Sequence, residues 1–188
     1  MTVTCSMTNS CWIKEDGQIT CYGSDENYLI STIPKSDRYY FFITSGQWHN
    51  CAISSTSHAI TCWGADNDGQ VSDTPTSGTY KFVSSGRYHN CAISSTSHAI
   101  TCWGKDASQV SATPTSGTYN FISSGSSHNC AISSSSHVIT CWGADYHNAV
   151  SDANLNAVNF PALNPSCFGN LFFFFLFYFW KGEQYFSF

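Results

Sequence analysis

The chain has 188 residues, of which only 10% are charged, well below the roughly 25% that is typical of soluble domains. Its formal charge of −5 argues against nucleic acid as a main partner, because phosphate binding needs clustered Lys and Arg. Aromatic residues make up 16% and are spread along the chain, which argues against a disordered protein.

Cysteines occur at regular positions and reveal an internal repeat. Eight of the ten form couples that lie 10 or 11 positions apart, and the couples recur every 39 or 40 positions. A fixed period of this size predicts a repeat architecture, in which each unit packs on its neighbours. The couples are Cys11 with Cys21, Cys51 with Cys62, Cys91 with Cys102, and Cys130 with Cys141.

The predicted repeats follow one another as approximately 1–40, 41–80, 81–119 and 120–158. The first copy has diverged most, since Ser6 and Asn9 stand where the later copies have Gly and His. The second and third copies share the string CAISSTSHAITCWG, and the fourth differs from it at two positions. A fifth copy begins near residue 159 and then loses the pattern.

Each copy has the pattern of short β-strands. Apolar residues alternate, β-branched residues dominate, and clusters of Ser, Gly, Pro and Asn recur at short intervals. About 40 residues per unit leave room for four strands, which suits a β-propeller blade. We therefore predict an all-β chain of four blades and a broken fifth.

The cysteine couples also predict a hairpin register. If Cys51 faces Cys62, then Ile53 faces Ile60, and a two-residue loop remains at 56–57. In the first copy, which is one residue shorter, the same rule leaves a three-residue loop that ends at Gly17, a residue suited to the left-handed position.

The pattern G-x-x-H-x-C-A-I, followed by C-W-G-x-D and Q-V-S, resembles the repeat of the regulator of chromosome condensation family. The resemblance covers roughly residues 5–160. It implies a ring of seven blades, of which this chain supplies four and a fragment, and it implies that the repeated His is a structural residue that bonds within its blade. In the second copy the pattern is carried by Gly46, His49, Cys51, Ala52, Ile53, Cys62, Trp63, Gly64, Asp66, Gln70, Val71 and Ser72.

An open row of four blades would expose strand edges and apolar faces. Three explanations compete: a truncated gene product, self-association that closes the ring, and a small ring or partial propeller. The repeated aromatic residues are expected to pack in the blades or between them. These residues are Trp63, Trp103 and Trp142, with Tyr22 in the first copy.

The opposed cysteines predict four cross-strand disulfides, and eight buried reduced thiols are the alternative. Disulfides favour an extracellular or cell-surface location, whereas the N-terminal residues do not resemble a signal peptide, so a cytoplasmic location stays open. Cys5 and Cys167 are left over, either free or paired across a ring closure.

We predict no catalytic residue, no metal site and no cofactor. His49, Cys51 and Cys62 lack the short ligand spacing of structural zinc sites. The segment 66–69 hints at a calcium loop but lacks the downstream acidic ligand. No carboxylate or nucleophile recurs with the repeated His, so the sequence gives no catalytic constellation.

Two stretches vary between copies that are otherwise nearly identical: the two residues before the repeated His, and the residues after W-G. A constant scaffold with variable loops is typical of repeat proteins that bind a partner, although neutral drift of exposed loops would leave the same pattern. Trp, Arg and Tyr are the residue types that anchor interfaces. The candidate partner-binding residues are Gln47, Trp48, Asp66, Asp68, Arg87, Tyr88, Lys105 and Tyr146.

The sequence therefore predicts a non-enzymatic module that binds a protein partner, whose identity it does not give. One alternative is an extracellular carbohydrate-binding or adhesive propeller that uses its Trp and Tyr residues. A second alternative is guanine-nucleotide exchange on the small GTPase Ran, the best-known role in the family, which ranks low without a full ring or a basic tail.

Residues 161–188 form a hydrophobic tail with the run LFFFFLFYFW at 171–180. Ten residues are too few to cross a bilayer core of about 30 Å, which takes roughly 20 residues in a helix, so no transmembrane span is predicted. The change in composition coincides with the loss of the repeat, which favours translated non-coding or frame-shifted sequence over an interfacial anchor.

Overall fold

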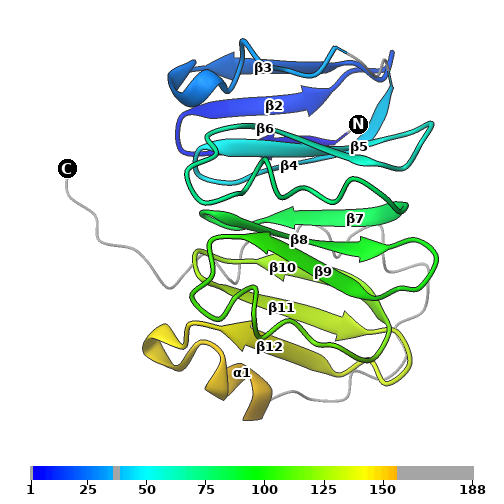
Figure 1. Cartoon of the computed structure of the whole chain (residues 1–188), viewed down its shortest axis with the longest axis vertical. Coiled ribbons are helices and arrows are strands. Elements are labelled where there is room, and N and C mark those ends of the chain that lie inside the picture. The colour runs from blue at the N-terminus through cyan, green and yellow to red at the C-terminus, as the bar shows by residue number, and fades with distance from the viewer. Residues whose placement is uncertain (1, 36–38, 156–188) are drawn as a thin grey trace.

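A computed structural model describes residues 2–35 and 39–155, so the tail at 161–188 lies outside the described residues. Within these residues the strands form four antiparallel sheets of three strands each, which stack in chain order along the longest axis of the molecule (Figure 1). The first two sheets consist of β1 (Val3–Cys5), β2 (Asn9–Ile13), β3 (Ile19–Gly23), β4 (Tyr40–Ser45), β5 (His49–Ser54) and β6 (Ile60–Gly64). The last two consist of β7 (Tyr80–Ser85), β8 (His89–Ser94), β9 (Ile100–Gly104), β10 (Tyr119–Ser124), β11 (His128–Ser133) and β12 (Ile139–Gly143).

Successive sheets pack in the same way. The first strand of each sheet lies against the first and middle strands of the sheet before it, so β4 lies on β1 and β2, β7 on β4 and β5, and β10 on β7 and β8. The sheets are propeller blades, and the described chain is an all-β partial propeller. The only helical segments described are η1 (Glu26–Tyr28), η2 (Tyr146–Asn148) and α1 (Ser151–Leu155). None of them is long and apolar enough to cross a membrane.

The predicted hairpin register is confirmed. Cys51 lies opposite Cys62, and Ile53 lies opposite Ile60. The first copy repeats both pairs, and its hairpin loop closes over three residues with Gly17 at a φ of 78°. Alternating apolar residues and paired cysteines were sufficient to place the register, because a shift by one residue would turn both features to the opposite face of the sheet.

The predicted two-residue loop in the later copies is wrong, because four residues, 55–58, make the turn. The last cross-strand hydrogen bond joins the N–H of Ser54 to the carbonyl of Ala59. The Ser54 hydroxyl accepts the N–H groups of Thr56 and Ser57, and His58 takes the left-handed conformation with a φ of 56°. The serine side chain thus competes with the strand ladder and ends it early.

Each blade has three strands rather than the expected four. After W-G the chain turns instead of extending, because the Asp66 carboxylate accepts the N–H groups of Val71 and Ser72 at 2.9 and 3.0 Å. Equivalent bonds form in the other copies from Asp25, Asp106 and Asp145. The repeated aspartate therefore shapes the segment in which a fourth strand was expected.

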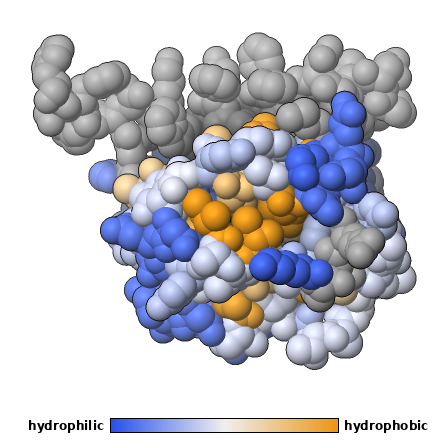
Figure 2. Space-filling view, turned by 90° about the horizontal axis from the view of Figure 1, so that it is seen from above, coloured by the Kyte–Doolittle hydropathy of each residue, from blue (hydrophilic) through white to orange (hydrophobic). Residues whose placement is uncertain are grey.

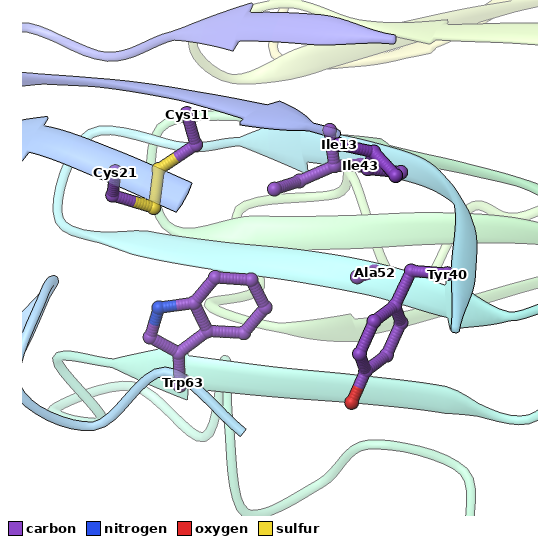
Figure 3. Close-up of a cluster of buried hydrophobic side chains, with 7 residues drawn as sticks. All are labelled: Cys11, Ile13, Cys21, Tyr40, Ile43, Ala52 and Trp63. Carbon is purple, nitrogen blue, oxygen red and sulfur yellow. A yellow bond between two sulfur atoms is a disulfide. The ribbon is translucent and has the colours of Figure 1, made fainter. Parts of the chain in front are cut away.

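The hydrophobic core lies between the sheets as three layers of the same composition. In each layer one sheet contributes a cysteine couple or one of its members together with two Ile residues, and the next contributes Tyr, Ile or Val, Ala and Trp. In the first layer, Trp63 of the second sheet lies next to the Cys11–Cys21 bond of the first, and Tyr40 lies at the other end of the layer, near Ile13 and Ala52 (Figure 3). The repeated Trp residues were expected to pack in the blades or between them, and they pack between them.

The outer face of the first sheet is the exception, and it corrects the expectation for Tyr22. Tyr22 is 64% exposed and stacks on Trp12, with ring centroids 5.3 Å apart. No described sheet packs on this face, and apolar residues gather at its centre when the molecule is seen from above (Figure 2). Tyr22 occupies the position of Trp63 without the covering sheet that buries Trp63.

All four cysteine couples are disulfides, so the alternative of buried reduced thiols is wrong. The bonds join Cys11 to Cys21, Cys51 to Cys62, Cys91 to Cys102, and Cys130 to Cys141. Cys5 is exposed and free, and Cys167 lies outside the described residues.

Alkylation tests this assignment. After denaturation without reductant, we expect at most two of the ten cysteines, Cys5 and Cys167, to react with iodoacetamide, because the other eight are bonded. The intact mass reports the number of labels, and the Cys5→Ser variant should carry one fewer. Labelling at any of the eight bonded positions would contradict the assignment.

Candidate functional site

A buried asparagine joins the second sheet to the third. The Asn90 amide nitrogen donates to the carbonyl of Gln70 at 2.9 Å, which fixes the orientation of the amide. Its oxygen accepts His49 Nε2 at 2.8 Å and the Ser85 hydroxyl at 2.7 Å. Because Asn90 is fully buried, these bonds replace water at every polar atom of its side chain except one amide hydrogen.

We call such a contact between neighbouring sheets a joint. The joint between the third and fourth sheets repeats this arrangement. Asn129 accepts His89 Nε2 at 2.8 Å and donates to the carbonyl of Gln109 at 3.0 Å. The same glutamine carbonyls also accept the indole N–H groups of Trp103 and Trp142, at 3.2 and 3.1 Å. Each joint therefore ties the loop of one sheet to the middle and outer strands of the next.

His49 and His89 bond between blades, which corrects the expectation that the repeated His bonds within its own blade. Because Asn90 presents its oxygen, the Nε2 atom of His49 must be the protonated nitrogen. The ring lies directly over Gly46, where a Cβ would collide with the imidazole and approach the carbonyl of Gly86 to 2.6 Å. This close packing explains why the copies with His have Gly three positions earlier, whereas the first copy has Ser6 and Asn9.

The joint between the first and second sheets lacks two of these four bonds. Asn9 stands in place of the His, and the buried amide nitrogen of Asn50 has no hydrogen-bond partner among the described residues. The Asn50 oxygen still accepts the Ser45 hydroxyl at 2.6 Å, and Trp63 donates to the carbonyl of Leu29 at 3.0 Å.

The variable stretches lie side by side at one end of the sheets. In the second, third and fourth copies, the residue after W-G donates its N–H to the carbonyl of the residue before the repeated His. The acceptors are Trp48, Tyr88 and Ser127, and the distances are 2.8 to 2.9 Å. A further bond of 3.2 Å joins the N–H of Gln47 to the carbonyl of Arg87, so the stretches also meet across the joint between sheets.

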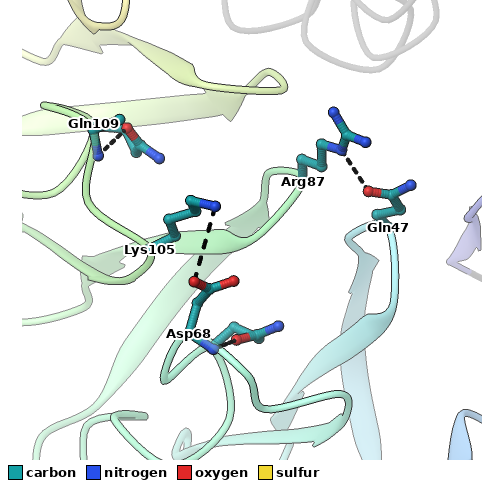
Figure 4. A network of polar contacts seen from close by, with 7 residues as sticks. Gln47, Asp68, Arg87, Lys105 and Gln109 are labelled. Carbon is teal, nitrogen blue, oxygen red and sulfur yellow. Dashed lines mark hydrogen bonds and ion pairs between the residues drawn. The ribbon is translucent and has the colours of Figure 1, made fainter. Parts of the chain in front are cut away.

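Five predicted residues form one contact network, the Tyr88 cluster, which consists of Gln47, Asp68, Arg87, Tyr88 and Lys105. Arg87 donates to the Gln47 side chain, and its guanidinium lies 5.0 Å from the centre of the Tyr88 ring. The Lys105 ammonium lies 5.1 Å from the centre of the same ring. It also lies 4.0 Å from the Asp68 carboxylate (Figure 4). Two cationic side chains thus make cation–π contacts with one half-buried aromatic ring.

The other three predicted residues lie outside this network. Trp48 is half-buried and contributes its carbonyl to the neighbouring loop, while Tyr146 is exposed in η2 of the fourth copy. Asp66 stabilises its own loop by accepting backbone N–H groups. Although burial raises the pKa of Asp66, the N–H groups of Ser72 and Val71 outweigh that effect and hold the pKa below its usual value.

The candidate metal ligands are occupied by other bonds. The disulfide between Cys51 and Cys62 removes the thiolates that zinc would need, and the Asp66 carboxylate accepts two backbone N–H groups. No group of three or more His, Cys, Asp or Glu side chains with metal-binding geometry occurs within residues 2–35 and 39–155.

No protein-family model matches the sequence, and no curated protein matches it. Solved structures do match. The CRINKLY WD40 ectodomain of the Arabidopsis thaliana receptor kinase ACR4 aligns with a TM-score of 0.64 at 23% identity, over 85% of this chain and 51% of that chain. The ectodomain of the Physcomitrella patens receptor kinase CR4 gives 0.64 at 20%, over 75% and 40%. Yeast RCC1 (Prp20), in its structure with Kap60, gives 0.65 at 14%, over 84% and 46%.

The chain has the repeat fold of the regulator of chromosome condensation propellers. At these identities the likeness shows the fold alone, and the chain spans about half or less of each of these structures. Activities and partners of whole propellers of this type are therefore not carried over to it.

No pattern within a single copy of the repeat marks the joint asparagines as functional residues. A signal was present, since H-N-C occurs in three copies and the first copy replaces that asparagine with Ser10. The partner of each asparagine, however, lies in the preceding copy about 20 or 40 positions away, and a pattern read within one copy does not show it.

The bonds at the joint predict that replacing equivalent asparagines in two copies lowers the free energy of unfolding by different amounts. Asn90→Ala should lower the free energy of unfolding by about 2 kcal/mol more than Asn50→Ala, because it leaves the buried His49 N–H without an acceptor and removes the bond to Gln70. Both variants lose a bond from a serine hydroxyl and create a similar cavity, so the difference isolates the contact between sheets. Urea denaturation measures both, and equal costs would contradict the role of this contact.

Burial of His49 predicts a dependence of stability on pH. Desolvation lowers the pKa of His49 to about 4, so the unfolded chain, with a pKa near 6.5, binds more protons than the folded chain between these values. Stability should be constant above pH 7 and should fall as the pH drops below about 6.5. At pH 4 the loss due to His49 alone should be roughly 3 kcal/mol.

Urea denaturation between pH 4 and 8 measures this loss. His49→Gln should make the profile shallower without flattening it, because desolvation also lowers the pKa of His89 and His128. His58→Asn, which removes an exposed histidine, is the control. The carboxylates with a lowered pKa, such as Asp25 and Asp145, lose most of their stabilising effect below about pH 4, so the variants are best compared above about pH 5. A flat profile in the unmodified protein would contradict the buried neutral imidazole.

Proposed function

We propose that the chain is a non-enzymatic scaffold that binds a protein partner through the Tyr88 cluster. The observation that supports this most directly is that the variable residues contact one another. Residues that differ between nearly identical copies meet in one contact network across the second and third sheets. Neutral drift would vary these positions without bringing an aromatic ring and two cations together.

The chemistry of the cluster suits a protein interface. Tyr and Arg are enriched among the residues that dominate binding energy, and a tyrosine that is already half-buried loses little conformational entropy on binding. The ion pair of Lys105 with Asp68 is long and partly exposed, so it contributes little by itself. A carboxylate of the partner can therefore replace Asp68 beside Lys105 at small cost.

The disulfides favour an oxidising compartment as the location of this function. Four bonded couples persist in oxidising compartments, so the extracellular side is the proposed location. Two of the similar structures are receptor ectodomains, which agrees with that location, whereas the yeast propeller is described with Kap60. Nucleotide exchange on a Ran-type GTPase fits an oxidised chain less well.

The test compares two variants of the third sheet. We expect a partner captured from a cell-surface fraction to bind Tyr88→Ala at least about tenfold more weakly than the unmodified chain, which corresponds to about 1.4 kcal/mol. Thr96→Ala, at the hairpin loop on the opposite end of the same sheet, should change the affinity less than twofold. Isothermal titration calorimetry measures each affinity.

Three outcomes would overturn this proposal. A partner that binds Tyr88→Ala and Arg87→Ala as tightly as the unmodified chain does not use the cluster. Glycan-array binding that is lost in Trp48→Ala would favour the carbohydrate-binding alternative. Accelerated release of labelled GDP from a Ran-type GTPase would favour exchange.

A further inference from the structure

The outer edge of each described sheet is a short strand without the usual protection against pairing. The outer strands β6, β9 and β12 share the sequence ITCWG, and β3 has ITCYG. These strands contain no charged residue, no Pro and no register shift. Natural proteins normally protect exposed edges with such features or cover them, because an open edge recruits another strand.

The hydrogen-bond pattern shows which peptide groups point outward. In the second sheet, bonded pairs join Ser54 to Ala59 and Trp48 to Ala65, and the alternation of an antiparallel ladder places Cys51 and Cys62 in an unbonded pair between them. The N–H and C=O groups of Cys62 therefore point away from β5. The third sheet repeats the pattern, so the same groups of Cys102 point away from β8.

In the fourth sheet these outward groups are occupied. The Asn154 side chain, from α1, accepts the N–H of Cys141 at 2.8 Å and donates to the carbonyl of Cys141 at 2.9 Å. An amide side chain thus makes the two bonds that a residue of a neighbouring strand would make. Cys141 is 4% exposed beneath this contact.

The equivalent groups in the second and third sheets are open. Within the described residues nothing pairs with the outward N–H and C=O of Cys62 or Cys102, and both residues are partly exposed. Since β6, β9 and β12 have the same sequence and register, the two open edges offer the same donor and acceptor that Asn154 uses.

We propose that the outer edges of β6 and β9 are docking sites for an extended peptide segment of a partner protein, which adds to the blade as its fourth strand. The partner's carbonyl accepts the N–H of Cys62 or Cys102, and its own N–H donates to the carbonyl of the same residue. Recognition of this kind depends on main-chain bonds, with side chains selecting among extended sequences. The site is separate from the Tyr88 cluster and does not depend on it.

The test measures exchange of individual amides with solvent by NMR. The probe is a short synthetic peptide of alternating Thr and Val with a Lys at each end. At saturating peptide we expect the amides of Cys62 and Cys102 to exchange at least about tenfold more slowly, because each then donates a hydrogen bond to the added strand. The amide of Cys141 should not respond, because Asn154 already occupies it.

Two matched controls test the mechanism. The same peptide with its pairing amides N-methylated should give no protection. Asn154→Ala should make the Cys141 amide exchange faster and respond to the peptide, and Asn154→Asp, which keeps the acceptor and loses the donor, should do so in part. Cooperative unfolding of both variants should be checked, since Asn154 also anchors α1.

Three results would overturn the proposal. The first is unchanged exchange at both Cys62 and Cys102 with millimolar peptide. The second is equal protection by the N-methylated peptide, which would mean contact without strand addition. The third is protection that rises with protein concentration in the absence of peptide, which would identify a second copy of the chain as the occupant.

Discussion

The buried contact between a histidine of one sheet and an asparagine of the next is the constraint on which the row of blades depends. It places a neutral imidazole, an amide and a loop carbonyl in a dry layer, where each group has a hydrogen-bonding role that only one orientation satisfies. Apolar packing between the sheets supplies the larger area, but its driving force is non-directional. At the two joints that have them, these polar bonds define how one blade sits on the next, and they require Gly46 and Gly86 beneath the rings.

The disulfides add a second constraint with two consequences. Each joins the middle and outer strands at an unbonded pair, so it holds the hairpin in register where no backbone hydrogen bond does. The same placement directs the peptide groups of the outer cysteine away from the sheet. A single feature of the sequence, cysteines 11 positions apart, therefore both closes the hairpin and leaves an outward-facing donor and acceptor on its edge.

The sequence was enough to predict the strands and the hairpin register, because these depend on period-two alternation within one copy. The prediction from the sequence failed where the structure depends on a hydrogen bond or a packing contact outside this alternation. The hairpin loops lengthen because Ser54 binds the turn, and Tyr22 is exposed because no described sheet covers it. The candidate site was half predictable: variation marked the residues, but only the structure separates Asp66, which braces its loop, from Asp68, which reaches Lys105 in the next copy.

The position of the Tyr88 cluster follows from the uneven quality of the joints. The first joint lacks the histidine and leaves the Asn50 amide nitrogen without a partner among the described residues, whereas at the joint between the second and third sheets Asn90 bonds to both His49 and Gln70. The cluster spans this second joint, with Gln47 and Asp68 on one sheet and Arg87, Tyr88 and Lys105 on the next. A binding surface assembled from two units keeps its geometry only if the units do not move against each other, so the most strongly bonded joint is where such a surface loses least on binding.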